Sequence, residues 1–158
     1  PVLKRPEPRL NETAIVPGTD GQKMSKSYGN IVELFGAPKE VRKTIMAIKT
    51  DSTSVGEPKD PEKCNVFALL KLLATPAELT EWRQKYHAGG MGYGEAKQRL
   101  AELYEQRFGP HREARAQWAA RPGDVEDVLR GGAKKARAVA QEVMADVRAA
   151  CGIRQRRA

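Results

Sequence analysis

The stretch CNVFALLKLLA, residues 64–74, carries apolar side chains around nearly the whole circumference of a helix. A helix without a polar face has to be covered by other elements, so this stretch predicts a buried helix inside a core. The segments before and after this stretch can cover it, because their apolar residues recur at the spacing of amphipathic helices. With 40% hydrophobic residues in the chain, the sequence predicts a mainly α fold, a helical bundle.

Helical patterns continue from residue 75 to the C-terminus. Thr75 is placed to cap a helix beginning at Pro76, which ends at the glycine-rich HAGGMGYG, residues 87–94. A longer pattern begins near Tyr93 and keeps its phase through Gly109-Pro110, so we expect one kinked helix there. After ARPGD, residues 120–124, we expect two helices, at about 124–130 and about 132–151.

Some positions of these helices are predicted to face inward from their spacing alone. In the long helix from Tyr93 the predicted inward positions toward its C-terminal end are Phe108, His111, Arg115 and Trp118. In the last helix they are Ala136, Val139, Val143, Val147 and Ala150.

Upstream of the central stretch the periodicity changes. Residues 38–49 predict a helix, because Val41, Ile45 and Ile48 share one face. The four residues TAIV, 13–16, are too few for a helix and predict a short buried strand that leads into a glycine-rich loop. We therefore place a domain boundary near residue 37, with a segment 1–36 of strand and loop before a helical domain 37–158.

The loop is VPGTDGQKMSKSYGN, residues 16–30. Lys23 and Lys26 are three residues apart, and Ser25 and Ser27 lie beside them. Two ammonium groups and two hydroxyls on a flexible backbone suit a polyphosphate, whose charge they would stabilise. The loop holds no nucleophile beside a base, and it is not a Walker A loop. From composition alone, an exposed basic turn is the favoured interpretation, since Lys, Ser and Gly are ordinary loop residues.

Charge and cysteine content narrow the function classes. The formal net charge is +8 and the excess leans toward the C-terminal IRQRRA, which favours polyanionic partners, although many soluble proteins carry such a surplus without binding nucleic acid. Cys64 and Cys151 fit neither a zinc site nor a disulfide framework, so no metal site is predicted. Without a signal-peptide pattern or a membrane-length apolar run, we expect a cytoplasmic protein.

The five residues KMSKS, 23–27, are identical to the signature loop of the class I aminoacyl-tRNA synthetases. Stretches over nearly the whole chain resemble the tryptophanyl-tRNA synthetases within that class. They are PGTDGQKMSKSYGN at 17–30, IKTDS at 48–52, GEPKDPE at 56–62, GYGEAKQRLAE at 92–102 and GGAKKARAVAQEVMADVRAACG at 131–152.

The resemblance implies ATP-dependent activation of tryptophan and its transfer to tRNA(Trp), with Mg²⁺ accompanying ATP. It implies that the loop ends a Rossmann-like α/β catalytic domain and precedes a helical anticodon-binding domain. Lys23 and Lys26 would stabilise the departing pyrophosphate. The other implied ATP-binding residues are Ser25 and Ser27 as assisting donors, Met24 as the apolar anchor of the loop, and Ala14 and Ile15 beside the adenine. Contacts with tRNA remain unassigned.

The sequence departs from the family at its start. A H-I-G-H-type motif is absent, since the two histidines, His87 and His111, lie far apart. The nucleotide-binding half, the tryptophan pocket and the main dimer surface are absent too. We therefore expect the C-terminal portion of a synthetase that is a homodimer at full length, and we expect this portion alone to form no adenylate. A stand-alone helical tRNA-binding or regulatory module is the alternative, and a basic helical scaffold is a third.

Overall fold

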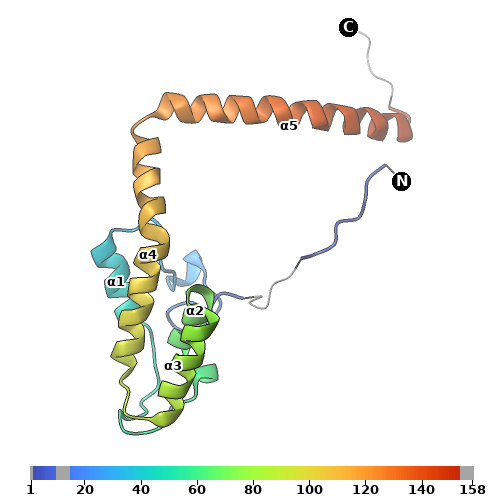
Figure 1. Ribbon diagram of the computed structural model, residues 1–158. Helices are drawn as coiled ribbons and strands as arrows, with labels where there is room; N and C mark the ends of the chain where they lie inside the picture. Colours follow the sequence, from blue (N-terminus) through green and yellow to red (C-terminus); the bar gives the residue numbers. More distant parts are fainter. Residues whose placement is uncertain (1, 10–14, 154–158) are drawn as a thin grey trace. The chain divides into compact units, whose positions relative to one another are not determined.

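A computed structural model describes residues 2–9 and 15–153, and in these ranges it contains helices and no strand (Figure 1). Contacts divide the chain into two units, residues 10–115 and residues 1–9 with 116–158. The α-helices are α1 (Pro38–Met46), α2 (Asn65–Leu73), α3 (Pro76–Ala88), α4 (Tyr93–Ala119) and α5 (Pro122–Ala150), and the 3₁₀ turns are η1 (Lys26–Tyr28) and η2 (Pro61–Lys63). The mainly helical prediction is confirmed.

Helix α2 lies at the centre of the core of the first unit. Val66, Phe67 and Leu70 on this helix are fully buried. The ring of Phe67 meets the ring of Tyr86 on α3 edge to face, with 5.3 Å between the ring centroids. Buried residues of α1 and α4 belong to the same core cluster: Val41, Ile45, Ala96, Leu100, Leu103 and Tyr104. Most of the apolar circumference of α2 is thus covered by three other helices, and Leu72 is the exposed exception.

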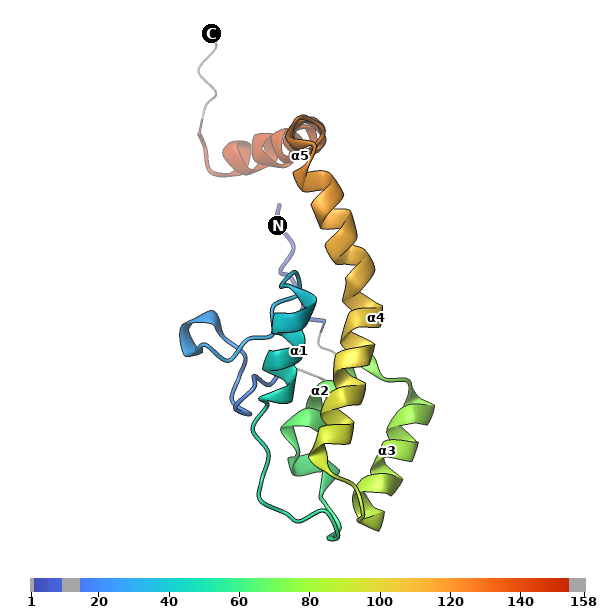
Figure 2. The same ribbon diagram turned by 90° about the vertical axis from the view of Figure 1, so that its left-hand side faces the viewer.

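Polar contacts join α4 to its neighbours at the edge of this core. Arg99 on α4 forms an ion pair with Glu78 on α3. Lys97 donates a hydrogen bond from its Nζ to the backbone oxygen of Met46, 3.1 Å away, at the end of α1. In Figures 1 and 2, α3 lies alongside the first turns of α4, and α1 lies alongside its middle turns. These contacts hold the three helices in one register around α2.

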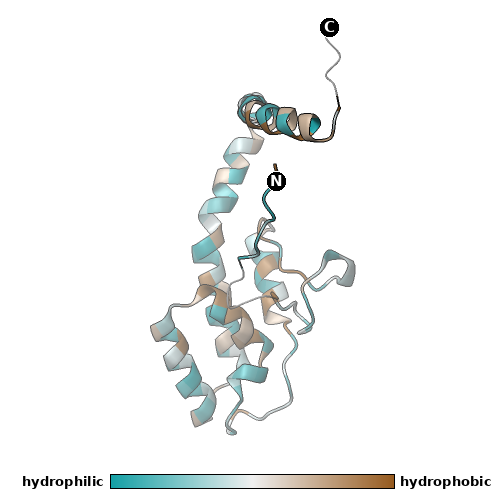
Figure 3. Ribbon diagram, turned by 90° about the vertical axis from the view of Figure 1, so that its right-hand side faces the viewer, coloured by the Kyte–Doolittle hydropathy of each residue, from teal (hydrophilic) through white to brown (hydrophobic). Residues whose placement is uncertain are grey.

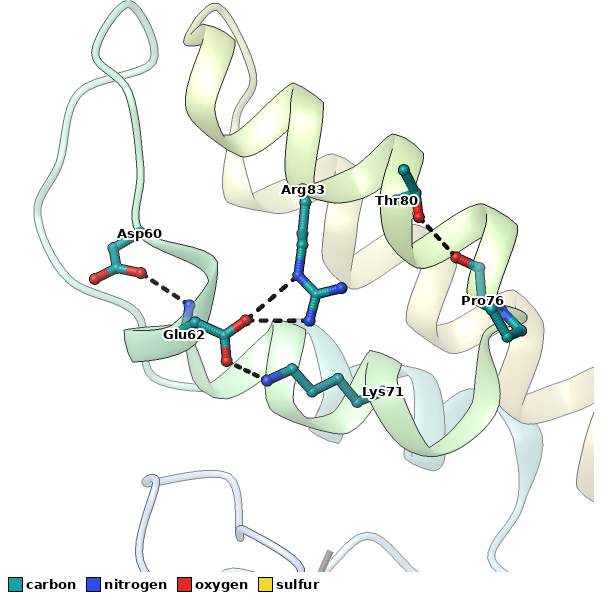
Figure 4. Close-up of polar contacts among 6 residues, drawn as sticks. All are labelled: Asp60, Glu62, Lys71, Pro76, Thr80 and Arg83. Atoms are coloured by element: carbon teal, nitrogen blue, oxygen red, sulfur yellow. Dashed lines mark hydrogen bonds and ion pairs between the residues drawn. The ribbon is translucent and has the colours of Figure 1, made fainter. Parts of the chain in front are cut away.

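The carboxylate of Glu62 on η2 connects α2 with α3 (Figure 4). It pairs with Lys71 on α2 and with Arg83 on α3, whose Nη2 lies 3.2 Å from Glu62 Oε1. Lys71 and then Arg83 hold the pKa of Glu62 below its usual value, against a smaller opposing effect of burial. The turn itself is fixed by Asp60, whose Oδ1 accepts from the Glu62 N–H at 3.0 Å. One side chain therefore ties a 3₁₀ turn to two helices.

The segment 50–60 has no helix or strand, yet a buried lysine organises it. Lys59 is 4% exposed, and its Nζ donates to the backbone oxygens of Ser54 at 2.6 Å and Glu57 at 3.1 Å. The same nitrogen lies 5.5 Å from the ring centroid of Tyr93 on α4. A buried ammonium is tolerated only where oxygens replace its water shell. These contacts hold the loop in place from its buried side.

Two expectations about the C-terminal helices are wrong. The segments 124–130 and 132–151 form one continuous helix, α5, because the adjacent Gly131 and Gly132 lower helix propensity without blocking a backbone hydrogen bond. The predicted inward stripe of α5 is not buried, and Val139 is 65% exposed. The described part of its unit contains no second long helix to cover that stripe. Figure 3 shows apolar and polar residues mixed along α5.

The α4 prediction is confirmed in its continuity and wrong in part of its burial. Pro110 lies inside one helix from Tyr93 to Ala119. Phe108 is partly buried against the core, but His111, Arg115 and Trp118 are exposed. The apolar stripe of α4 thus ends where the covering helices end. Among the described residues, no helix combines the length and the hydropathy needed to cross a membrane.

The predicted buried strand 13–16 is not seen where it can be judged. Ile15 is 59% exposed and Val16 is 40% exposed, and neither belongs to a strand. A strand needs a run of paired backbone groups, and here the pairing is limited to the Met24 N–H donating to Val16 O at 2.9 Å and one isolated bridge beside it. Thr13 and Ala14 lie outside the described residues.

We predict that Phe67→Ala lowers the free energy of unfolding by about 3–5 kcal/mol, because it leaves a cavity beneath Tyr86. Urea unfolding followed by fluorescence would measure this in a Trp118→Phe background, where Trp82 alone reports on the first unit. Leu72→Ala on the same helix is the matched control. Because Leu72 is 38% exposed, this substitution should lower the free energy of unfolding by about 1 kcal/mol or less. Equal losses for both variants would contradict a core centred on α2.

Candidate functional site

The glycine-rich loop 16–30 folds back on itself through backbone hydrogen bonds. Pro17 and Lys23 form an isolated antiparallel bridge, and the Gly18 N–H donates to Gln22 O at 2.6 Å. The 3₁₀ turn η1 follows, and Gly29 closes it with a φ of 66°, a left-handed conformation that favours glycine. In Figures 2 and 3 the loop stands out from the side of the helices. The chain thus presents residues 23–28 on a short projection.

The two lysines of this projection are exposed. Neither Lys23 nor Lys26 forms an ion pair with a carboxylate in the ranges the structure describes. Ser25 and Ser27 lie together, with 2.8 Å between their Oγ atoms. The loop therefore offers two positive charges and two adjacent hydroxyls to solvent, a donor set that suits an anion with several oxygens.

Met24 turns the opposite way and packs against the core. It is partly buried and lines an apolar cavity of about 270 Å³. Leu69 of α2 and Leu100 and Tyr104 of α4 line the same cavity. One apolar side chain between Lys23 and Ser25 thus attaches the polar loop to the helices.

Asn30 lies beneath the loop and is 2% exposed. Its Nδ2 donates to Asp20 Oδ1 at 2.8 Å and to Lys23 O at 3.2 Å. Its Oδ1 accepts from the Ser25 N–H at 2.8 Å, and its backbone oxygen accepts from the Thr19 N–H at 3.0 Å. Both amide hydrogens and the amide oxygen are thereby satisfied. The side chain ties together three points of the loop that are not adjacent in sequence.

Asp20 completes this network. Its Oδ1 also accepts from the Gln22 N–H at 3.0 Å. The hydrogen bond from Asn30 is the main cause that lowers the pKa of Asp20 below its usual value, so the carboxylate is ionised at neutral pH. Thr19 O accepts from the Lys49 N–H at 2.8 Å, which joins the loop to the segment after α1. The base of the loop is thus fixed by hydrogen bonds while its tip is exposed.

The sequence profile of the tRNA synthetases class I (W and Y) matches residues 2–109, more than half of the chain. The chain belongs to this family. Relatives of it are tryptophan–tRNA ligases. That of Rhodopirellula baltica is 49% identical over 145 residues, which are 92% of this chain and 45% of that protein. That of Pseudomonas aeruginosa is 41% identical over 153 residues, which are 96% of this chain and 34% of that protein.

Solved structures agree with this. A tryptophanyl-tRNA synthetase from Campylobacter jejuni, complexed with ADP and tryptophan, superposes with a TM-score of 0.78 at 41% sequence identity. The match covers 91% of this chain and 46% of that one. The chain thus spans less than half the length of the synthetases it resembles.

Sequence reasoning named the lysines, the serines and Met24 of this synthetase loop and missed the hydrogen-bonded pair at its base. Ile15 precedes the loop as an exposed residue, and the predicted Ala14 lies outside the described residues. Asn30 and Asp20 were missed, although an Asp and an Asn bracketing a glycine loop are typical of side chains that bond to nearby backbone. In the described ranges no three His, Cys, Asp or Glu side chains gather as metal ligands.

We predict that Gly18→Ala opens the loop of this synthetase chain. A Cβ at residue 18 would lie 2.3 Å from Asn30 Nδ2 and 2.7 Å from Asn30 O, so Asn30 would have to move. Trypsin cleavage after Lys23 and Lys26 should then be at least about tenfold faster than in the parent chain. Gly56→Ala is the control, because its Cβ meets nothing within 4 Å. Unchanged cleavage in Gly18→Ala would contradict the described packing.

Proposed function

We propose that this chain is the C-terminal portion of a tryptophan–tRNA ligase, which activates tryptophan with ATP and transfers it to tRNA(Trp). The observation that carries the proposal is the KMSKS loop. Its base is tied down by Asn30, and its two lysines reach solvent with no carboxylate partner among the described residues. Similarity to tryptophan–tRNA ligases along nine-tenths of the chain supports the assignment.

Activation of tryptophan requires charge stabilisation more than proton transfer. A carboxylate oxygen of the amino acid attacks the α-phosphorus of ATP, and the bond from that phosphorus to the bridging oxygen breaks. Pyrophosphate leaves with the electron pair and gains negative charge. Cationic groups placed where this charge develops lower the barrier, because they bind the transition state more tightly than the ground state. The two lysines of the loop can supply such cationic groups.

We assign this stabilisation to Lys23 and Lys26. Ser25 and Ser27 add hydroxyl donors, and Met24 keeps the loop attached to the core as it moves onto the triphosphate. Ala14 and Ile15 would lie beside the adenine. Mg²⁺ would arrive with ATP, held mainly by phosphate oxygens and water, since Mg²⁺ commonly binds through substrate phosphates and few protein ligands.

The helical region is proposed to bind the anticodon of tRNA(Trp). The net charge of +8 favours a polyanionic partner, and the excess of Lys and Arg lies toward the C-terminus. The complete protein is proposed to act as a homodimer in the cytoplasm, with the remaining part of the catalytic domain supplying the amino-acid pocket.

We predict that Lys26→Ala in the natural-length protein lowers kcat for tryptophan-dependent ATP–pyrophosphate exchange by about 10²–10³-fold, the range found when one transition-state donor is removed. The KM for tryptophan should change less than about twofold, because Lys26 is assigned to the triphosphate. Lys39→Ala, a substitution of an exposed lysine on α1, is the control and should leave the exchange rate unchanged. A Lys26→Ala enzyme as active as Lys39→Ala would refute the assignment.

We also predict that the chain binds tRNA(Trp) more tightly than the same tRNA with a replaced anticodon. Filter binding at two salt concentrations would measure both affinities. Base contacts keep their discrimination as salt rises, whereas phosphate contacts weaken for both tRNAs together. Equal affinities that fall steeply with salt would contradict anticodon recognition and leave a helical region that supplies only nonspecific charge.

A further inference from the structure

The polar side chain buried most deeply at the base of the loop is Asn30, and the chemistry proposed for the lysines gives it no role. Its two backbone partners in the loop are Lys23 O and the Ser25 N–H. These groups lie on either side of Met24. One amide therefore grips the backbone immediately before and after the residue that anchors the loop, and it restricts the backbone dihedral angles from Lys23 to Ser25.

The orientation of this amide is determined by its partners. A rotated amide would place Oδ1 against two acceptors, Asp20 Oδ1 and Lys23 O, and Nδ2 against the Ser25 N–H. Three attractive contacts would become repulsive, so only one orientation is compatible with the fold. Asp20 thus fixes which end of the Asn30 amide faces the loop.

The surroundings of Asn30 leave it little freedom to move. Gly18 approaches it so closely that a Cβ at residue 18 would overlap its side chain. Its backbone oxygen holds Thr19, and Thr19 O in turn is bound by the Lys49 N–H at the end of α1. The hydrogen bonds of Asn30 are therefore connected to the helices, and they define the position of the loop relative to the core.

We propose that Asn30 is a positioning residue for the loop: its amide clasps Lys23 O and the Ser25 N–H, with Asp20 as its orienting partner, and so places Lys23 and Ser25 toward the triphosphate of the nucleotide. The inference rests on the proposed function. It predicts that the fit of the loop to the reacting phosphates depends on a hydrogen-bonded pair that does not itself touch them. Misplacement of a reacting group by about 1 Å can cost about 10²-fold in rate.

The test uses Asn30→Asp in the natural-length protein. Aspartate has the shape of asparagine and can still accept from the Ser25 N–H, but its ionised form puts a second carboxylate against Asp20 and an acceptor against Lys23 O. We expect kcat for ATP–pyrophosphate exchange to fall at least about tenfold. The KM for tryptophan should change less than about twofold, since the clasp acts on the triphosphate side of the reaction.

A charge exchange distinguishes positioning from simple loss of folding. Asp20→Asn alone keeps an acceptor oxygen for Asn30 but loses the charge that orients the amide, so its kcat should fall less than that of Asn30→Asp. The double variant Asp20→Asn with Asn30→Asp restores a donor–acceptor pair between the two positions, while Lys23 O still faces an acceptor. It should therefore recover part, at least about a third, of the lost activation free energy, as an interaction term between contacting residues. The free energy of unfolding of each variant in urea, measured beside kcat, separates the two cases, since positioning predicts a loss of kcat larger than the loss of folded protein.

Amide hydrogen exchange at Ser25 supplies a readout that needs no catalysis. The Ser25 N–H should be protected in the parent, exchange faster in Asn30→Asp, and regain protection in the double variant. If the parent is active and Asn30→Asp is equally active, the role of Asn30 is refuted while the proposed function stands. The same conclusion follows if the double variant recovers none of the lost activity. A natural-length parent without tryptophan-dependent exchange would overturn the proposed function itself, and this role with it.

Discussion

The fold depends on one constraint, the need to cover most of the apolar surface of α2. Its side chains are apolar around the helix, so exposure of any face would forfeit about 25 cal/mol for each Å² of apolar surface left in water. Helices α1, α3 and α4 meet that need from three directions, and the ion pairs of Glu62 and Arg99 lie at the edges of the contact. Exposed pairs of this kind contribute little to stability and mainly fix the register.

The loop obeys a different rule from the core beneath it. In the function proposed above, its tip presents positive charge to a phosphate, and carboxylates that neutralised this charge would oppose that function. The residues that hold the loop in place are different from the residues that carry its positive charge. Met24 and the amide of Asn30 hold the loop from below, and the two lysines take no part in holding it. A cation kept without a local counter-charge retains its attraction for an incoming phosphate.

The sequence predicted the core helices well because burial has a local signature. The spacing of Val41, Ile45 and Ile48, and the unbroken apolar run at 64–74, follow directly from which faces are covered. It failed for α5, where the same apolar spacing occurs without a helix to cover it. It also failed for the buried strand at Ile15 and Val16, because a strand depends on a partner that no local pattern specifies.

The residues of the candidate site likewise fall into some that the sequence could predict and others that it could not. The lysines and serines could be named from the motif, because their role follows from charge and residue type. The clasp could not, since Asn30 meets Asp20, Lys23 and Ser25 only after the loop has turned back on itself. Its function depends on distances, and an asparagine in a glycine-rich sequence is otherwise typical of an ordinary turn.

The buried ammonium of Lys59 has a consequence for the covalent chemistry of this surface. Its segment is rich in Ser, Thr, Gly and Pro, a composition that suggests a freely accessible lysine. Instead Nζ occupies the place that a small monovalent cation would take among backbone oxygens, enclosed by Ser54 O, Glu57 O and, at 3.5 Å, Val55 O. Amine-reactive labels and acylating enzymes act on an accessible nitrogen, so they would pass over Lys59 while the segment is folded. Its modification would mark chains in which this segment has come apart.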